Sequence, residues 1–394
     1  MSLRPTPLPH NAADVADIVA DALRSGDHLE IRGGGSKAQI GAPRMSAILE
    51  TAGISGVIDY DPAELVLTVR AGTSLAEIEA LVGSQGQMLA FDPFDHGPIF
   101  GNANATATIG GVVAAGVAGS RRLSAGSARD HLLGFEAVSG RAERFIAGAK
   151  VVKNVTGYDL PKLAAASWGR LFVLTEITLK VLPRPTTQAT VAVEGLSADQ
   201  ARRALARAMR SQADVQAAAH IPAHATGGGA LTAVRLEGFG PSVAARIAMM
   251  NTLWRDDGSP RVLSEDTAAN YWSGIRNLSR LEDGRPLWRI NTPPSGGPIV
   301  VAALEPFAPN WLFDWAGGLI WMTLDCEAAS VRAAAKAAGG HAMLMRAHES
   351  MQRTTPPFHP PEPGVGALEA RVRAAFDPQG VFETGRFLDA THAD

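Results

Sequence analysis

The residues with the clearest chemical use form a glycine-rich turn, Gly33-Gly34-Gly35-Ser36-Lys37, directly after a strand-like stretch at residues 28–32. Three successive glycines lack Cβ atoms and allow positive φ angles, so their backbone N–H groups can converge on an anionic oxygen. Ser36 adds a hydroxyl donor and Lys37 adds a positive charge. The turn therefore suits a pyrophosphate, with an ordinary glycine-rich hairpin turn as the alternative. Its spacing matches neither the P-loop of nucleotide hydrolases nor the Gly-x-Gly-x-x-Gly motif of nicotinamide enzymes.

Three further segments contain small or polar residues that suit a bound ligand. Residues 108–118, which begin Thr-Ile-Gly-Gly-Val-Val-Ala-Ala-Gly, predict a helix with small residues on every face, and a tightly packed core helix explains the same pattern. Gly126-Ser127-Ala128-Arg129-Asp130 forms a polar turn before a strand. Residues 153–160 form a polar cluster before a helix, with a plain capping turn as the alternative.

The elements that would position these segments alternate between strands and helices. The pattern predicts a helix at residues 11–25 with Asn11 as its N-cap, and strands at residues 134–139 and 171–182. The last strand ends at Pro183-Arg184-Pro185, where we place a domain boundary. Beyond it, the sequence predicts a helix at residues 197–212 and strands at residues 230–237 and 298–304.

Composition narrows the classes of function. A chain of 394 residues is long enough for two or three domains. Its net charge of −3, without a basic cluster, argues against nucleic-acid binding. A single cysteine, Cys326, excludes a disulfide framework, a cysteine-ligated zinc site and an iron–sulfur cluster held by this chain alone. Without a signal-peptide core or an apolar run of about 20 residues, we expect a cytoplasmic protein with no direct membrane span, and any peripheral attachment would be through a partner.

Taken in order, five stretches resemble the FAD-binding domain of the vanillyl-alcohol oxidase/PCMH superfamily, and more narrowly the FAD-binding subunit of bacterial glycolate oxidase. They read IRGGGSK, ATIGGVVAAGVAGSRR, AGSARDHLLGFEAVSGRAE, VKNVTGYDLPKLAAASWG and LTEITLKVLPRP. The resemblance covers residues 28–185 and reappears at residues 287–289, 339–342 and 376–382. Each motif is weak alone, whereas the set in this order is specific.

The resemblance implies an α+β fold: a PCMH-type FAD-binding domain of two α/β subdomains at residues 1–185, and an α+β capping domain at residues 186–394 whose C-terminal segment returns toward the flavin. It implies FAD as the cofactor, with the glycine turn on the pyrophosphate and the other segments along the dinucleotide. The cofactor-binding residues expected on this basis are Arg32, Gly33, Gly34, Gly35, Ser36, Lys37, Thr108, Ile109, Gly110, Gly111, Ala114, Gly126, Ser127, Asn154, Gly157, Gly169 and Val173.

Two departures from the relatives concern the same site. Phe172 stands where relatives have glycine, so its ring either crowds the cofactor or fills space against it. The usual Phe-Asn-Pro-Gly-Arg near the C-terminus is Phe382-Glu383-Thr384-Gly385-Arg386 here.

Covalent attachment of the flavin needs a histidine or cysteine, and neither comes directly after the glycine turn. His96 is the nearest candidate for such a bond, with a simple loop role as the alternative. We therefore expect noncovalent FAD.

Oxidation of a 2-hydroxy acid needs a cation for the carboxylate and a base for the hydroxyl proton. Arg289, Arg346, His341 and His348 are available in the second half, and a structural role is the alternative for each. The histidine-rich metal motif of related 2-hydroxy acid enzymes is missing, so we expect no metal and assign no catalytic residue.

The resemblance implies oxidation of glycolate, a small 2-hydroxy acid, to glyoxylate. It also implies two partners, a second FAD-containing subunit and an iron–sulfur subunit, to which electrons pass. The alternatives are a stand-alone FAD-dependent 2-hydroxy acid or alcohol oxidoreductase, and a non-catalytic scaffold subunit that holds FAD.

Overall fold

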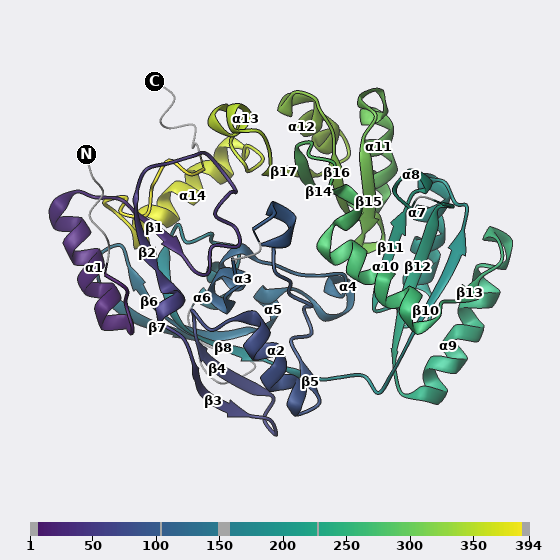
Figure 1. The fold of residues 1–394 in the computed structure, drawn as a ribbon, viewed down its shortest axis with the longest axis horizontal. Helices are drawn as coiled ribbons and strands as arrows, with labels where there is room; N and C mark the ends of the chain where they lie inside the picture. Colours follow the sequence, from purple (N-terminus) through teal and green to yellow (C-terminus); the bar gives the residue numbers. More distant parts are fainter. Residues whose placement is uncertain (1–6, 103–104, 149–157, 227, 388–394) are drawn as a thin grey trace. The chain divides into compact units, whose positions relative to one another are not determined.

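The computed structural model describes residues 7–102, 105–148, 158–226 and 228–387, and Figure 1 labels its elements. The chain divides into two compact units. The first comprises Met1–Ala118, Gly126–Arg184 and Pro360–Asp394, and the second comprises Gly119–Ala125 and Pro185–His359. The division near Pro185 agrees with the sequence pattern, but the units are not the contiguous stretches 1–185 and 186–394, because two segments belong to the other unit.

A five-stranded sheet organises the first unit, in the order β3-β4-β8-β6-β7. All of its neighbouring strands pair antiparallel. Its long central strands, β8 and β6, are buried along most of their length. The strands are β3 (Val57–Asp61), β4 (Val66–Arg70), β6 (Leu132–Ser139), β7 (Arg144–Gly148) and β8 (Phe172–Lys180).

The N-terminal part of this unit begins with α1 (Ala12–Ser25), as the sequence predicts. The side chain of Asn11 accepts hydrogen bonds from the first turn, and Gly26 ends the helix at φ 74°. Strand β1 (Leu29–Arg32) then pairs parallel with β2 (Ala47–Glu50), and β5 (Gln87–Met88) pairs with β9 (Leu182–Pro183). The other helices of the unit are α2 (Leu75–Ser84), α3 (Ile109–Ala115), α5 (Ala128–His131), α6 (Leu160–Ala164) and α14 (Pro363–Phe376).

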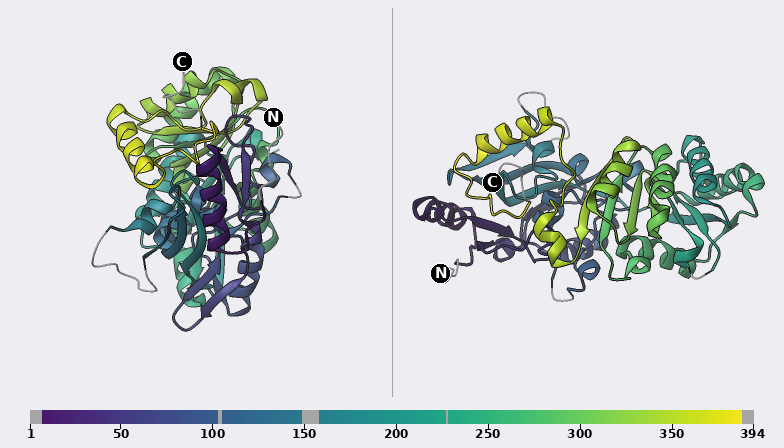
Figure 2. Two further views of the ribbon diagram at one scale, coloured as in Figure 1. Left: turned by 90° about the vertical axis from the view of Figure 1, so that its left-hand side faces the viewer. Right: turned by 90° about the horizontal axis from the view of Figure 1, so that it is seen from above.

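The C-terminal segment belongs to the first unit because its apolar residues complete that core. Val381 and Phe382 are buried in a cluster with Val138 and Val173. The N–H of Leu29 donates to the carbonyl of Val381 at 2.8 Å, which ties the segment to β1. In Figure 2 this last, yellow part of the chain lies beside strands of the same unit. The resemblance implied that the C-terminal segment returns toward the flavin, and the described residues of that segment belong to the first unit.

An eight-stranded sheet forms the centre of the second unit, in the order β13-β10-β12-β11-β15-β16-β14-β17. The pairings among its strands are antiparallel. The strands are β10 (Thr187–Glu194), β11 (Ala217–Ile221), β12 (Leu231–Gly238), β13 (Arg261–Val262), β14 (Leu287–Asn291), β15 (Asn310–Asp314), β16 (Leu319–Thr323) and β17 (His341–Arg346).

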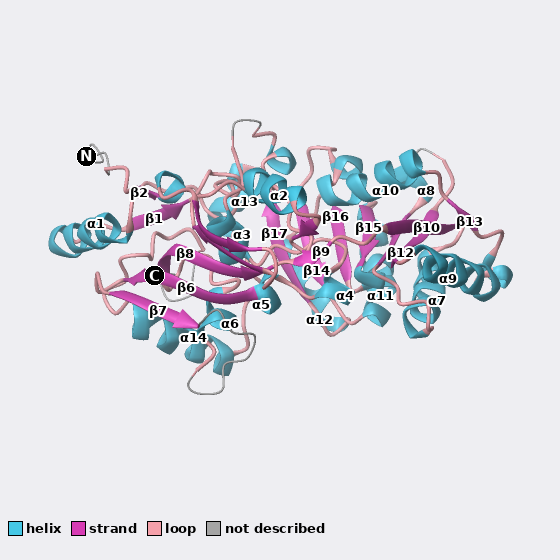
Figure 3. Ribbon diagram, turned by 90° about the horizontal axis from the view of Figure 1, so that it is seen from below, coloured by secondary structure: helices cyan, strands magenta, loops and turns pink. Residues whose placement is uncertain are grey.

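Helices lie on both faces of this sheet, as Figure 3 shows. On one face lie α7 (Ala198–Arg210), α9 (Gly240–Leu253), α11 (Gly297–Leu304) and α12 (Ala328–Ala337), which bury two apolar clusters against the strands. Helices α8 (Ala223–Thr226) and α10 (Glu265–Asn277) lie on the other face. The short helices α4 (Arg122–Ala125) and α13 (Glu349–Thr354) complete the unit.

The predicted strand at residues 298–304 is wrong, because this segment is helix α11. Its sequence, Pro-Ile-Val-Val-Ala-Ala-Leu, is a short apolar run, and periodicity alone does not distinguish a buried strand from a buried helix. Pro298 stands near the first turn, where a helix tolerates it. Val300, Val301 and Leu304 are buried in the cluster that α11 shares with α12.

Candidate functional site

The glycine turn after β1 packs closely against a neighbouring loop. A Cβ atom on Gly33 would lie 2.2 Å from Oγ1 of Thr108, and one on Gly34 would lie 1.9 Å from the carbonyl oxygen of Thr106. Only Gly35 of the three adopts a positive φ, at 80°, and the nearest atom to its added Cβ is Cδ of Arg32 at 4.0 Å. Gly33 and Gly34 therefore permit loop contact, and Gly35 alone supplies the left-handed backbone.

The segment that meets this turn begins helix α3, as the sequence predicts. Thr108 is the N-cap residue, and its hydroxyl accepts a hydrogen bond from the N–H of Gly111 at 3.3 Å. Gly110 packs against Ala71, whose carbonyl accepts a hydrogen bond from the Gly110 N–H at 2.8 Å. The small residues of α3 thus serve close packing on one side, while Gly111 and Ala114 remain at a cleft on the other.

The turn and α3 border an open cleft whose free space, counted out to the solvent at its mouth, is about 710 Å³. All of its lining residues belong to the first unit. They are Glu30, Ile31, Arg32, Gly33, Gly34, Gly35, Ser36, Lys37, Ala38, Thr51, Thr108, Gly110, Gly111, Ala114, Ala115, Trp168, Gly169, Phe172, Leu174 and Arg386. Three cationic side chains and one anionic side chain give this lining a net charge of +2.

Lys37 is the cation whose surroundings most clearly require an anion. Its side chain is buried, and within the described residues its ammonium bonds to the Ser36 hydroxyl at 3.3 Å and forms no ion pair. Burial lowers the pKa of Lys37 to about 8, with Asp95 opposing this effect and Arg386 adding to it. A buried cation with a single neutral partner is costly unless a bound anion compensates it.

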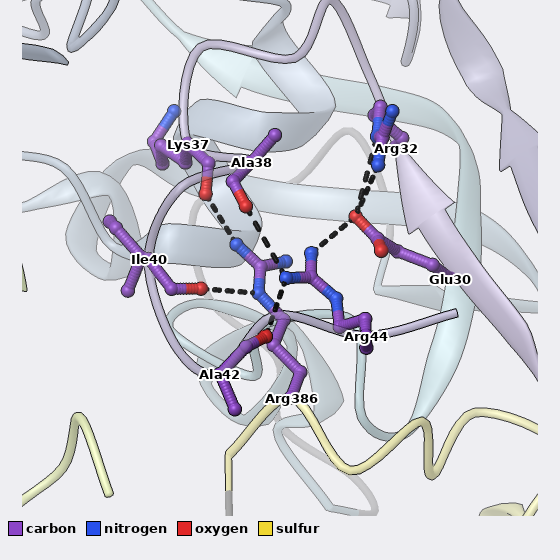
Figure 4. A network of polar contacts seen from close by, with 8 residues as sticks. All are labelled: Glu30, Arg32, Lys37, Ala38, Ile40, Ala42, Arg44 and Arg386. Carbon is purple, nitrogen blue, oxygen red and sulfur yellow. Dashed lines mark hydrogen bonds and ion pairs between the residues drawn. The ribbon is translucent and has the colours of Figure 1, made fainter. Parts of the chain in front are cut away.

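A network of three arginines around one buried carboxylate supports the turn (Figure 4). Glu30 pairs with Arg32 at 3.0 Å and with Arg44 at 2.5 Å. Burial alone would raise the pKa of Glu30, but Arg44, Arg386 and Arg32 together hold it below its ordinary value. Glu30 therefore stays ionised, and the surplus positive charge faces the cleft.

Arg386 reaches this network from the C-terminal segment. Its Nε donates to the Ile40 carbonyl at 2.9 Å, and its Nη2 donates to the Lys37 carbonyl. The N–H of Ala42 in turn donates to the Arg386 carbonyl at 2.9 Å, so backbone and side chain both fasten the segment to the loop after the glycine turn. Burial and the nearby Arg44 lower the pKa of Arg386 to about 9.

The opposite lining is aromatic and apolar, from Trp168, Phe172 and Leu174. Phe172 fills space rather than standing alone in the cleft, because its ring stacks on Phe135 at 5.2 Å and meets Phe145 edge-on at 5.3 Å. Trp168 has a φ of 56°, which costs a non-glycine residue about 1–2 kcal/mol. Its N–H donates to the Ala114 carbonyl at 2.8 Å, which holds this strained turn against α3.

The cleft brings together most of the predicted cofactor residues. Eleven of them line it: Arg32, Gly33, Gly34, Gly35, Ser36, Lys37, Thr108, Gly110, Gly111, Ala114 and Gly169. Four do not: Ile109 and Val173 are buried in the core, whereas Gly126 and Ser127 form the turn that caps α5 through Asp130. Asn154 and Gly157 lie outside the described residues.

Glu30, Thr51, Trp168 and Arg386 also line the cleft, although the sequence did not predict them as cofactor residues. A signal existed for Trp168, which directly precedes the predicted Gly169. Glu30 and Thr51 carry no local motif, and Arg386 is about 350 positions from the turn that it contacts.

The remaining candidates are scattered. His96 is buried and stacks on Phe94 at 4.6 Å without lining the cleft. Arg289 and His341 lie on adjacent strands of the second unit, β14 and β17. Arg346, at the end of β17, donates to the Leu281 carbonyl at 3.3 Å, and His348 precedes α13.

The described part of the chain offers neither a cluster of metal ligands nor a membrane-spanning helix. Among its residues, no three or more histidine, cysteine or carboxylate side chains gather as a metal ion would need. None of its helices is long and apolar enough to cross a bilayer.

Comparison with known proteins defines the class. Residues 7–147 match a family described as an FAD-binding domain. The fold resembles p-cresol methylhydroxylase with substrate bound (TM-score 0.72, 13% identity, 98% of this chain and 89% of that chain) and alkyldihydroxyacetonephosphate synthase (TM-score 0.66, 14% identity, 96% and 76%). The predicted α+β, PCMH-type fold and the predicted FAD cofactor are confirmed, and the chain is an FAD-dependent oxidoreductase.

Proteins similar in sequence define a narrower family than the fold does. Over 370 residues the chain is 34% identical to the glycolate oxidase subunit GlcE of Escherichia coli (strain K12), covering 93% of this chain and 95% of that protein. The chain therefore belongs to the GlcE family of glycolate oxidase subunits, as the resemblance predicted. It is also 31% identical over 135 residues to the glycolate oxidase subunit GlcD of Bacillus subtilis (strain 168), but this covers only 34% of the chain and 27% of GlcD.

Proposed function

We propose that this chain is the GlcE-type, FAD-holding subunit of an assembly that oxidises glycolate to glyoxylate. The observation that carries the proposal is the match to GlcE along nearly the whole of both chains. The relation to GlcD is confined to about a third of this chain, so a role as the GlcD-type subunit is less well supported.

FAD would be held in the cleft beside the glycine turn, where Lys37 and Arg386 would neutralise its phosphates. The fit rests on the buried Lys37 ammonium, which forms no ion pair within the described residues, and on the net positive lining. Trp168, Phe172 and Leu174 offer apolar surface to a flat ring and exclude water from it. Among the described residues, neither histidine nor cysteine lines the cleft, which supports noncovalent binding.

Bound FAD supplies an acceptor for the hydride that leaves the carbon atom of a 2-hydroxy acid. The chain's own residues bind the dinucleotide and neutralise its phosphates. Its single cysteine cannot form an iron–sulfur relay, so electrons would pass to partner subunits, namely a second FAD-containing subunit and an iron–sulfur subunit.

The visible spectrum of the purified chain, before and after acid precipitation, tests this proposal. We expect a flavin spectrum whose colour remains in the acid supernatant, and slow or no bleaching by glycolate until the partner subunits are added. Rapid bleaching of the isolated chain by a 2-hydroxy acid would favour the stand-alone enzyme. A flavin that no substrate reduces, even with partners present, would favour the scaffold. A colourless protein whose melting temperature is indifferent to FAD would refute the proposal.

A further inference from the structure

The second unit contains a cationic group of residues that the flavin cleft does not use. Arg289 on β14 pairs with Met343 on β17, and Asn291 pairs with His341. Directly paired residues of antiparallel strands point to the same face, and so do residues two apart on one strand. Arg289, Asn291 and His341 therefore share one face of the sheet. Their neighbours Trp288, Ile290 and Ala342 point to the other face, into the core with α11 and α12.

Trp315 forms an aromatic platform for two guanidinium groups. The Cζ atom of Arg122 lies 4.4 Å from the centre of its ring, and that of Arg289 lies 5.3 Å from it. The ring is buried, and its Nε1 donates to the Gly119 carbonyl at 3.0 Å. These residues all belong to the second unit.

The backbone at this platform is strained and firmly held. Trp315 and Ala316 both have positive φ, at 52° and 56°, where each non-glycine residue costs about 1–2 kcal/mol. Asp314 holds the turn, because its Oδ1 accepts from the Trp315 N–H at 2.7 Å and its Oδ2 accepts from the Ser120 hydroxyl at 2.8 Å. Strain that the surroundings maintain is typical of functional sites.

The charges that act on Arg289 and on its neighbour His341 are positive. Within the described residues, its guanidinium donates no hydrogen bond and joins no ion pair. Burial and the like charge of Arg122 lower the pKa of Arg289 to about 10. Burial lowers the pKa of His341 as well, and the charges that act on it, those of Arg289, His359 and Arg122, are all positive. A partly buried guanidinium that meets only like charge implies an anion that completes the site.

We propose that Arg289, assisted by Arg122 and His341, binds the carboxylate group of a small 2-hydroxy acid. The planar fork of a guanidinium matches a carboxylate with two parallel hydrogen bonds. Asn291 adds an acceptor on the same face, since its buried Oδ1 has no hydrogen-bond partner among the described residues. A donor group such as the hydroxyl next to the carboxylate would satisfy it. This inference rests on the proposed function and extends it to a substrate site in this chain.

Calorimetric titration of the full chain with glycolate and with oxalate, at constant ionic strength, tests the assignment. We expect both to bind, and Arg289→Gln to weaken binding by about 10-fold to 100-fold. Arg289→Lys should restore part of the affinity, because it keeps the charge but not the fork. Arg346→Gln is the matched control: Arg346 lies on the strand of His341, but its guanidinium donates to the Leu281 carbonyl, so the substitution should leave the affinity unchanged.

Wild-type affinity for oxalate and glycolate in Arg289→Gln would overturn the inference. A wild-type chain that binds neither glycolate nor oxalate, or that binds chloride equally well, would also overturn it. In that case an acidic side chain of a partner would be the better candidate for the anion that Arg289 binds. The thermal midpoint of each variant checks folding, and we expect little change from Arg289→Gln because it removes a partly buried charge that joins no ion pair within the described residues. Carboxylate binding is measured whether or not the protein is yellow, so a colourless chain contradicts the proposed function while the Arg289 comparison still decides the inference.

Discussion

At the residue scale, the ammonium group of Lys37 has opposite effects on folding and on anion binding. Its pKa falls from an ordinary value of 10.5 to about 8 in the folded chain, chiefly through burial. A depression of this size corresponds to roughly 3 kcal/mol. The same group, once it faces a phosphate, gains a charge-assisted hydrogen bond in a place of low dielectric.

Replacing Lys37 by methionine should therefore separate the two effects. We expect Lys37→Met to weaken FAD binding about 10-fold to 100-fold and to raise the free energy of unfolding without FAD by about 1–3 kcal/mol at neutral pH. Flavin titration and denaturant unfolding of the apoprotein measure the two quantities. Lys180→Met is the control, since Lys180 is eight residues along β8 from Phe172, about 26 Å away. A variant that keeps wild-type affinity for FAD would show that Lys37 does not face the phosphates.

The same pKa predicts how both quantities depend on pH. Between pH 8 and pH 10.5, approximately, the unfolded chain keeps the Lys37 proton that the folded apoprotein releases. The free energy of unfolding of the apoprotein should therefore rise with pH over this range. FAD affinity should change in the opposite direction, because the anion binds the protonated form, and it should fall as the pH passes about 8. Titrations at several pH values, with Lys37→Met as the reference, check both slopes, and parallel slopes in the two proteins would contradict the assignment.

The sequence predicts an anion site at the glycine turn from residue types alone, but two of its three glycines have another role in the structure. Gly33 and Gly34 are small because Thr108 and Thr106 approach them, and such an approach between segments about 70 residues apart has no local signature. The strained φ of Trp168 and the buried charge of Glu30 are likewise products of packing.

At the element scale, the predicted helices at residues 11–25 and 197–212 are confirmed and both have side-chain caps, whereas the uncapped apolar run predicted as a strand is a helix. Asn11 and Gly26 define α1, and Ser197 and Gln200 form the capping box that starts α7. Helix α11 has no side-chain cap, so its sequence lacks the local signal that marks a helix start. Its buried residues pack against α12, and the sequence pattern does not show this contact. The C-terminal segment after α14 has no regular structure in its described part, so its place beside β1 could not be predicted from periodicity.

That segment leads to a prediction about Arg386. Arg386→Met removes the donors to the Ile40 and Lys37 carbonyl groups, so we expect the free energy of unfolding to fall by about 1–3 kcal/mol. FAD affinity should fall as well, because the cleft loses one positive charge. Arg141→Met is the matched control: Arg141 also bonds a C-terminal carbonyl, that of Ala375 at 2.7 Å, but does not line the cleft. If both variants lose equal stability and neither loses flavin, Arg386 has only a structural role.

At the scale of the whole molecule, each unit is assembled from separated pieces of the chain. The first unit needs residues beyond Pro360, and the second includes Gly119–Ala125 from the first half. A linear pattern places a boundary where the composition changes, which in this sequence is at Pro185. It contains no information about which later segment returns to an earlier core, since that depends on apolar contacts between distant residues.

The discontinuous first unit predicts that residues 1–185 alone do not fold stably. The fragment lacks Val381 and Phe382, which are 3% and 6% exposed, and the ring of Phe376 against Phe172. Burial of three such side chains contributes about 5–8 kcal/mol, which is comparable to the whole stability of a domain. Circular dichroism and flavin titration should show a poorly ordered fragment with little affinity for FAD. Adding a separate peptide of residues 360–394 should restore both, and the same peptide with Phe382→Ala should restore less. Cooperative unfolding and full flavin affinity in the fragment alone would show that the C-terminal segment is dispensable to this unit.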